Sequence, residues 1–202
     1  MKKRSGWRIF GKIVLWTIGV LLVLIIALGI YVVQAGKMNP PVVADTTSLQ
    51  WERKQISPTA YTPGNSWFRK SQSGLYEMYV EGKPFERGVV YGKLASELVK
   101  RQEDAFTDQI KKMIPSESYL KFLKYFIGFF NRHLLAHVIE EYQQEIYGVS
   151  FSASDKYDFI GTNFGRIMNY HAAHDIGHAL QSMALVGCTS FGTGMAALPT
   201  AV

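Results

Sequence analysis

Residues 82–92 read GKPFERGVVYG and open the helical body that we expect for this chain. Pro84 suits a first helical position, because its missing N–H would have no partner there. Gly88 and Gly92 are four residues apart and therefore share one helical face. A glycine costs about 1 kcal/mol relative to alanine in a helix interior. The two glycines therefore predict a face that lies close to a neighbouring backbone.

The pattern on both sides of this stretch predicts a mostly helical body with little strand. Residues 75–80 (LYEMYV) roughly alternate and are rich in aromatic side chains, so we expect a strand. Residues 34–73 carry Pro and Gly at short intervals and no lasting period, so we expect a linker. Further helices are expected at 85–113, at 139–148 with Gly148 just past the end, at 155–168 after the capping box Ser152–Asp155, and at 172–185.

Residues 116–138 are rich in aromatic and aliphatic side chains but are interrupted by basic residues too often to form a second membrane span. Two interpretations stay open. The segment is either a pair of core helices, which we favour, or an amphipathic stretch that lies on a membrane or lines an acyl-chain groove.

Residues 13–33 (IVLWTIGVLLVLIIALGIYVV) are uncharged, and about 20 such residues span a bilayer as a helix. Residues 1–12 form a basic head, which we expect in the cytoplasm, with the body exported to the other side. A cleaved signal peptide is the alternative, since Val33–Ala35 resembles a cleavage site. The apolar run is, however, longer than the about 7–15 residues of a signal sequence.

The charge distribution argues against a nucleic-acid partner. The chain has 22 basic and 16 acidic residues, and five of the basic ones precede the apolar run, so the remainder carries 17 − 16 = +1. A phosphate-binding surface needs a basic face on the body, which this composition does not offer.

Three histidines near the C-terminal end, His171, His174 and His178, share one helical face. Such a stripe could hold zinc, but the HExxH pattern of helix-borne zinc sites is absent. His133 and His137 are also four residues apart. For all five we expect packed or capping roles, and no metal or cofactor.

The single cysteine, Cys188, excludes an intramolecular disulfide. It follows an apolar run in the sequence Gly187-Cys188-Thr189-Ser190. From its surroundings alone it is either a small packed side chain or a reactive thiol.

Three segments together resemble the acyl-coenzyme A:6-aminopenicillanic acid acyltransferase family, whose members are autoproteolytic cysteine N-terminal-nucleophile proteins. Residues 82–92 resemble the GxPxExGxxxG opening of the family, Glu145–Gly148 resembles its EI-G step, and Gly187–Phe191 resembles its processing site. The resemblance covers roughly residues 75–191.

The resemblance implies that the chain cleaves itself between Gly187 and Cys188. The freed Cys188 would carry a thiol nucleophile and an α-amino group, and the latter titrates near pH 8 and so can accept the thiol proton. The implied reaction is acyl transfer to, or hydrolysis of, a small acyl or amide substrate.

The implied fold is α+β: a transmembrane helix followed, over residues 74–202, by a mostly helical part of the αββα sandwich of N-terminal-nucleophile proteins. In the family most strands, and an arginine–asparagine–aspartate segment, follow the nucleophile, whereas residues 192–202 carry no charge and no alternation. We therefore expect a truncated member with little or no activity of its own. The competing hypothesis is a non-enzymatic, membrane-anchored module that binds lipid or a protein through its aromatic helices.

Overall fold

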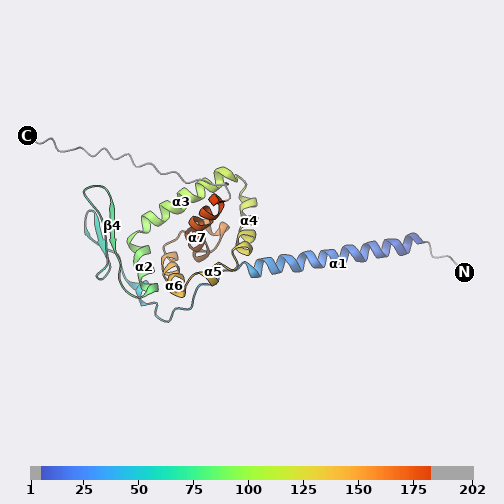
Figure 1. Ribbon diagram of the computed structural model, residues 1–202, viewed down its shortest axis with the longest axis horizontal. Coiled ribbons are helices and arrows are strands. Elements are labelled where there is room, and N and C mark those ends of the chain that lie inside the picture. Colours follow the sequence, from blue (N-terminus) through green and yellow to red (C-terminus); the bar gives the residue numbers. More distant parts are fainter. Residues whose placement is uncertain (1–5, 183–202) are drawn as a thin grey trace, which may run out of the picture. The chain divides into compact units, whose positions relative to one another are not determined.

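The computed structural model describes the backbone of residues 6–182 and the side chains of residues 6–172 other than residue 8. Over these residues the chain is α+β and mostly helical, with a four-stranded antiparallel sheet. It divides into two compact units, Met1–Met168 and Asn169–Val202. The elements (Figure 1) are α1 Gly6–Ala35, η1 Thr47–Gln50, β1 Lys54–Ser57, β2 Ala60–Thr62, β3 Trp67–Lys70, β4 Tyr76–Tyr79, α2 Pro84–Leu94, α3 Ser96–Met113, α4 Glu117–Phe130, α5 Leu134–His137, α6 Glu140–Ser150, η2 Asp155–Ile160 and α7 Asn163–Ser182.

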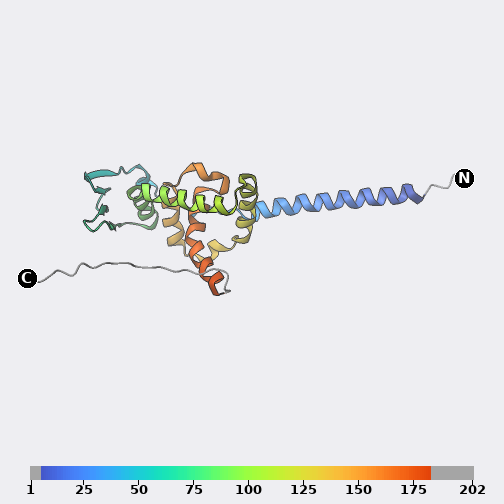
Figure 2. The same cartoon turned by 90° about the horizontal axis from the view of Figure 1, so that it is seen from above.

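Helix α1 is a single long apolar helix (Figure 2). Its stretch Ile9–Ala35 is long and apolar enough to cross a membrane, and its most apolar window has no buried residue. A core helix of a soluble domain would instead be covered by the rest of the protein. The expected span thus has the length and composition of a transmembrane helix, and it extends beyond residues 13–33 at both ends.

The sheet is a meander in the order β1-β2-β3-β4, and it lies beside α2 in both views (Figures 1 and 2). Phe68 of β3 is buried against Val90 and Leu94 of α2, which fixes the sheet to the helix. The strand predicted at 75–80 is confirmed as β4. Residues 34–73, predicted as a linker, contain η1 and three strands. These strands have only three or four residues each, too few to show a period between the Pro and Gly turns.

The helix predicted over 85–113 is wrong in its continuity, because it is divided at Ala95 into α2 and α3. Pro84 does begin α2, as predicted. No glycine or proline marks the break in the sequence. Leu94 and Ala95 are both buried there, so tertiary packing rather than local propensity sets the change of direction.

The helices predicted at 155–168 and 172–185 are correct over residues 163–168 and 172–182 but wrong in their bounds and in their division. Residues 155–160 form η2, which ends at Gly161, and α7 then runs without interruption from Asn163 to Ser182. The predicted capping is present in part: the Ser154 hydroxyl accepts a hydrogen bond from the N–H of Lys156 at 3.4 Å. The structural reason for the difference is the set of side-chain contacts that surround Arg166, described below.

Candidate functional site

Helices α2 and α6 touch through their backbones at the glycines that carry the sequence resemblance. A β-carbon on Gly88 would overlap the carbonyl group of Glu145, and one on Gly148 would lie 2.6 Å from the amide nitrogen of Val89. Both positions therefore admit only glycine at this helix separation. The prediction of close backbone approach at Gly88 is confirmed. The prediction that Gly148 lies past a helix end is wrong, because Gly148 is a buried interior residue of α6.

Gly92 extends the same contact one turn further. A β-carbon there would lie 2.6 Å from the hydroxyl oxygen of Ser152 and 3.2 Å from the carbonyl oxygen of Val149. The nearest neighbour is a side chain that can rotate, so this position is less restrictive than Gly88. The shared face predicted from the four-residue spacing is thus the face that meets α6.

Arg87 joins the two helices on the edge of this contact. Its guanidinium donates to Glu141 at 2.7 Å, to Glu145 at 3.1 Å and to the carbonyl oxygen of Gly82 at 3.0 Å. The hydrogen bond to Glu141 is the largest cause that raises the pKa of Arg87. Gly82 itself has a φ of +116°, a conformation that favours glycine. Two segments about 60 residues apart in sequence are therefore held as one unit by glycine contacts and an ion pair.

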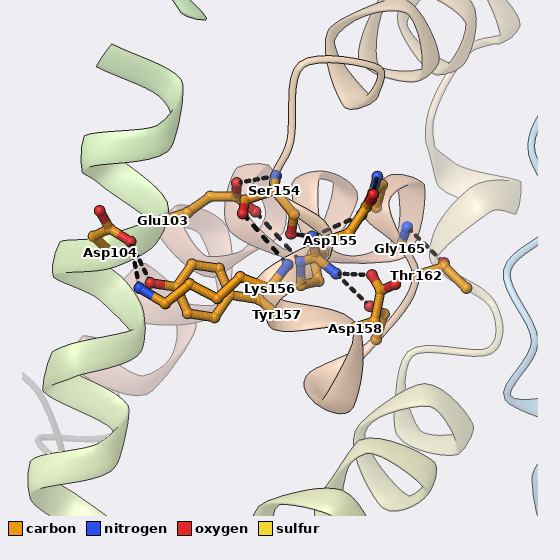
Figure 3. A network of polar contacts seen from close by, with 12 residues as sticks. Glu103, Asp104, Ser154, Asp155, Lys156, Tyr157, Asp158, Thr162 and Gly165 are labelled. Carbon is orange, nitrogen blue, oxygen red and sulfur yellow. Dashed lines mark hydrogen bonds and ion pairs between the residues drawn. The ribbon is translucent and has the colours of Figure 1, made fainter. Parts of the chain in front are cut away.

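A buried ion pair between Glu103 of α3 and Arg166 of α7 forms a second polar centre (Figure 3). The two side chains are 1% and 2% exposed, and Arg166 Nε lies 3.3 Å from Glu103 Oε1. The other carboxylate oxygen of Glu103 accepts a hydrogen bond from the N–H of Ser154 at 2.7 Å. Such a pair is costly to bury unless its remaining groups are also satisfied.

The guanidinium of Arg166 is fully satisfied. An arginine has five N–H donors, and five acceptors surround this one within hydrogen-bonding distance. They are Glu103 Oε1, Asp158 Oδ1, the carbonyl oxygens of Gly161 and Ser154, and Asn163 Oδ1, at 2.6–3.3 Å. No donor is left for a substrate. The Glu103–Arg166 pair therefore acts as a structural centre that fixes η2 and the first turn of α7 to α3.

A second contact of α3 joins the more exposed Asp104 to Tyr157 and Lys156 (Figure 3). The phenol of Tyr157 donates to Asp104, and this hydrogen bond is the largest cause that lowers the pKa of the carboxyl group. Burial, and then the same hydrogen bond, raises the pKa of Tyr157. Tyr157 is 2% exposed, so its ring also contributes to the core.

A surface depression lined by residues 51–53, the α2–α3 junction and residues 151–153 carries three basic side chains, Arg53, Lys93 and Lys100. Two of them already have partners. Lys93 donates to the carbonyl oxygens of Ser48, Leu49 and Trp51, and burial lowers its pKa. Arg53 pairs with Glu97 at 2.5 Å. Lys93 therefore holds η1, Arg53 joins the segment after η1 to α3, and neither cation is a ready anion site.

The predicted catalytic residue Cys188 and its neighbour Gly187 lie outside the described residues. Of the histidine stripe, His171 is an exposed residue of α7, whereas the side chains of His174 and His178 are outside the described part. His133 and His137 are exposed around α5. Within residues 6–172 no three His, Cys, Asp or Glu side chains are grouped so that they could hold a metal ion.

The comparisons with known proteins do not identify the chain. No family model, no curated protein and no solved structure matches it. The class and the activity of the protein are therefore inferred from its own residues and their contacts alone.

Sequence reasoning missed the Glu103–Arg166 pair, because its members are 63 residues apart and each stands in an otherwise ordinary helical pattern. Arg87 lies inside the motif at residues 82–92, but the sequence does not identify its partners on α6. One signal was present. Glu141 and Glu145 are four residues apart, so they share a helical face on which a cation could bind both.

Proposed function

We propose that the chain is a membrane-anchored member of the cysteine N-terminal-nucleophile acyltransferases and amide hydrolases, with Cys188 as its nucleophile. The observation that supports this proposal is the contact between α2 and α6. Two of the three segments that resemble the family, residues 82–92 and Glu145–Gly148, pack on each other through Gly88 and Gly148. The same close contact between α2 and α6 accounts for the glycine in each segment. The two segments together are therefore a more specific pattern than either one alone.

The proposed self-cleavage needs only groups of this chain and water. The Cys188 thiol attacks the carbonyl carbon of Gly187, the peptide C–N bond breaks, and a thioester forms. The thiol proton passes to the departing nitrogen, which becomes the α-amino group of Cys188. Water then hydrolyses the thioester, which leaves a carboxylate on Gly187 and restores the thiol.

The mature nucleophile would use the same groups on a substrate. An α-amino group has a pKa of about 7.7–8.0, so at neutral pH part of it is free to accept the thiol proton. The thiolate attacks the carbonyl of an acyl or amide substrate, a thioester forms, and the leaving group takes the proton. Water completes a hydrolysis, and an amine completes a transfer.

The test is intact-mass analysis of the full chain expressed in membranes. We expect a break at Gly187–Cys188, and we expect Cys188→Ala to abolish it because no thiol remains to form the thioester. Ser190→Ala is the matched control, since it removes a nearby hydroxyl and keeps the thiol. A chain that stays uncleaved, together with amide hydrolysis equal in the Cys188→Ala variant, would contradict the proposal.

We further propose that the head 1–12 lies in the cytoplasm and that the body is exported. The support is charge: five basic residues and no acidic residue precede the apolar run. Protease protection of sealed vesicles checks the orientation. In inside-out vesicles the body should be protected, and degradation of the body there would contradict it.

A further inference from the structure

Helix α4, whose position Figure 1 shows, carries a stripe of aromatic side chains that are at least half exposed among the described residues. Tyr119, Phe122, Phe126 and Phe130 are spaced three, four and four residues apart and so share one helical face. Their exposed fractions are 51%, 64%, 59% and 72%. Leu120 is the one buried residue of this helix. The favoured prediction that 116–138 forms core helices is therefore wrong for this face, since a core helix would bury it.

The C-terminal end of α1 lies directly against α4. A β-carbon on Gly36 would lie 2.7 Å from the amide nitrogen of Phe129, and one on Gly128 would lie 2.7 Å from the carbonyl oxygen of Gly36. The rings of Tyr31 and Phe129 meet edge to face at 5.9 Å. Backbone contact at a pair of glycines and a ring contact one turn earlier thus join the apolar surface of α1 to α4.

The length of α1 places this contact at the level of the lipid headgroups. Ile9–Ala35 has 27 residues, or about 40 Å of helix. A bilayer is about 30 Å thick in its hydrocarbon core and about 40–45 Å including the headgroups. Centred in the bilayer, α1 ends about 5 Å outside the hydrocarbon core, so Gly36 just after it lies in the headgroup layer. Tyr31 is four residues from the end of α1, about 6 Å along its axis, and therefore lies at the boundary between the core and the headgroups. A helix that touches both residues lies at this boundary.

The charge of the region around α4 suits an anionic lipid surface. Residues 111–138 contain five basic residues and one acidic residue, a net charge of +4. They are Lys111, Lys112, Lys121, Lys124 and Arg132 against Glu117. The segment 139–160 that follows contains five acidic residues and one basic residue, a net charge of −4. Of these two adjoining segments, the positive one contains the exposed aromatic stripe.

We propose that α4 is an interfacial helix that lies in the headgroup layer of the same bilayer that α1 spans, with its aromatic stripe in the lipid. The proposal depends on α1 being the membrane span and does not depend on the chemistry of Cys188. The contact with α1 favours lipid as the partner of the aromatic stripe. The end of α1 touches Gly128 and Phe129, which are next to Phe130 of the stripe, so the stripe adjoins the proposed membrane span. A second copy of the chain would have to displace lipid from this position.

The experiment places a nitroxide spin label at Phe122→Cys or Phe126→Cys in the full chain, with Cys188→Ala as the background. The protein is reconstituted in vesicles of phosphatidylcholine and phosphatidylglycerol. Collisions with oxygen, which enters lipid, are compared with collisions with a nickel chelate, which stays in water. Tyr142→Cys is the matched control, since Tyr142 is an aromatic residue of α6 that is 57% exposed.

At both α4 positions we expect oxygen collisions to exceed nickel collisions, with a label depth of about 5–10 Å below the membrane surface. At Tyr142 we expect the reverse. Labels on α4 that resemble the Tyr142 label would overturn the proposal. Labels on α4 shielded from both reagents, with broadening between copies that grows with the protein-to-lipid ratio, would also overturn it and identify a second copy as the occupant. Equal circular dichroism of the variants checks that each one is folded.

Discussion

The interior around Arg166 and the outer face of α4 both reverse the usual arrangement of a soluble protein. In such a protein charged side chains usually lie outside and aromatic side chains inside. The interior holds an ion pair that is almost fully buried, while the outer face presents four aromatic side chains that are 51–72% exposed among the described residues. In the interior every donor of the guanidinium has an acceptor. The buried charges are therefore expected to stabilise the fold, whereas the exposed rings should contribute little to it and form the surface that we propose for lipid.

The largest expected effect is at the buried pair. Arg166→Met leaves Glu103 buried without its cation, and removing one partner of such a pair typically costs about 3–5 kcal/mol. Urea unfolding of the detergent-solubilised chain, followed by tryptophan fluorescence, measures the free energy of unfolding. Arg69→Met is the matched control, because the Arg69–Glu77 pair on the sheet is 56% and 42% exposed. It should cost no more than about 1 kcal/mol.

A double variant sharpens the same comparison. Glu103→Leu with Arg166→Met removes both charges, so most of the loss should be recovered relative to Arg166→Met alone. If the double variant were less stable than the single one, the hydrogen bonds to Ser154 and Asn163, and not the ion pair, would be the main stabilising contacts.

The second effect is at the contact of α2 with α6. Gly88→Ala adds a β-carbon that overlaps the backbone of Glu145. Overpacking of this kind costs about 1–3 kcal/mol or more, which outweighs the roughly 1 kcal/mol that alanine gains in helix propensity. Gly92→Ala is the matched control and should cost less, since the Ser152 hydroxyl can rotate away. Thermal unfolding of both variants checks the order, and equal losses would argue against a rigid backbone contact at Gly88.

The third effect is smaller and depends on pH. Tyr157→Phe removes the hydrogen bond to Asp104 and should cost about 1 kcal/mol at neutral pH. The pKa of Asp104 is lowered in the fold, so its contribution is present above about pH 4 and is lost as the pH falls through the lowered value. The pKa of Tyr157 is raised, so its contribution is present below about pH 10 and is lost as the pH rises through the raised value.

The free energy of unfolding of the unsubstituted chain, measured against pH, should therefore fall at both limits. The Tyr157→Phe variant should lose part of the alkaline decline, to which Tyr79 also contributes, and part of the acid decline. Tyr142→Phe is the control, since Tyr142 is exposed, and its profile should follow that of the unsubstituted chain. Parallel profiles for the two variants would contradict the role given to the Asp104–Tyr157 hydrogen bond.

The smallest effect on stability is expected on the outer face of α4. Phe122→Ser and Phe126→Ser should each change the free energy of unfolding by no more than about 0.5 kcal/mol, because both rings are exposed. Leu120→Ala on the same helix should cost about 2 kcal/mol or more, because Leu120 is 4% exposed. The same unfolding measurement checks all three. A large loss at Phe126 would mean that its ring packs on protein.

Local rules predicted the parts of the fold that local sequence determines. Pro84 marked a helix start, the alternation at 75–80 marked a strand, and the Gly88–Gly92 spacing marked a face of close backbone contact. Long-range packing decided the rest. The break at Ala95 has no local signal. Both a core helix and a helix on a membrane surface are rich in apolar residues. The composition of α4 therefore could not decide between these two interpretations.

The candidate site was predictable only as far as the resemblance reached. The resemblance singled out the glycines of α2 and α6, which the structure describes, and Cys188, which lies outside the described residues. The pairing of Arg87 with Glu141 and Glu145, and that of Glu103 with Arg166, joins residues 54–63 positions apart, which no helical or strand period relates. The sequence carried the members of each pair without indicating that they meet.

The full satisfaction of Arg166 has a consequence for the order of folding. Its acceptors come from α3, from the Ser154–Asn163 segment and from the start of α7. None of these hydrogen bonds can form until residue 166 has left the ribosome. Until then Glu103 lacks its cation and must stay in contact with water. Helix α3 therefore reaches its buried position late, after α1 and α4 have been synthesised.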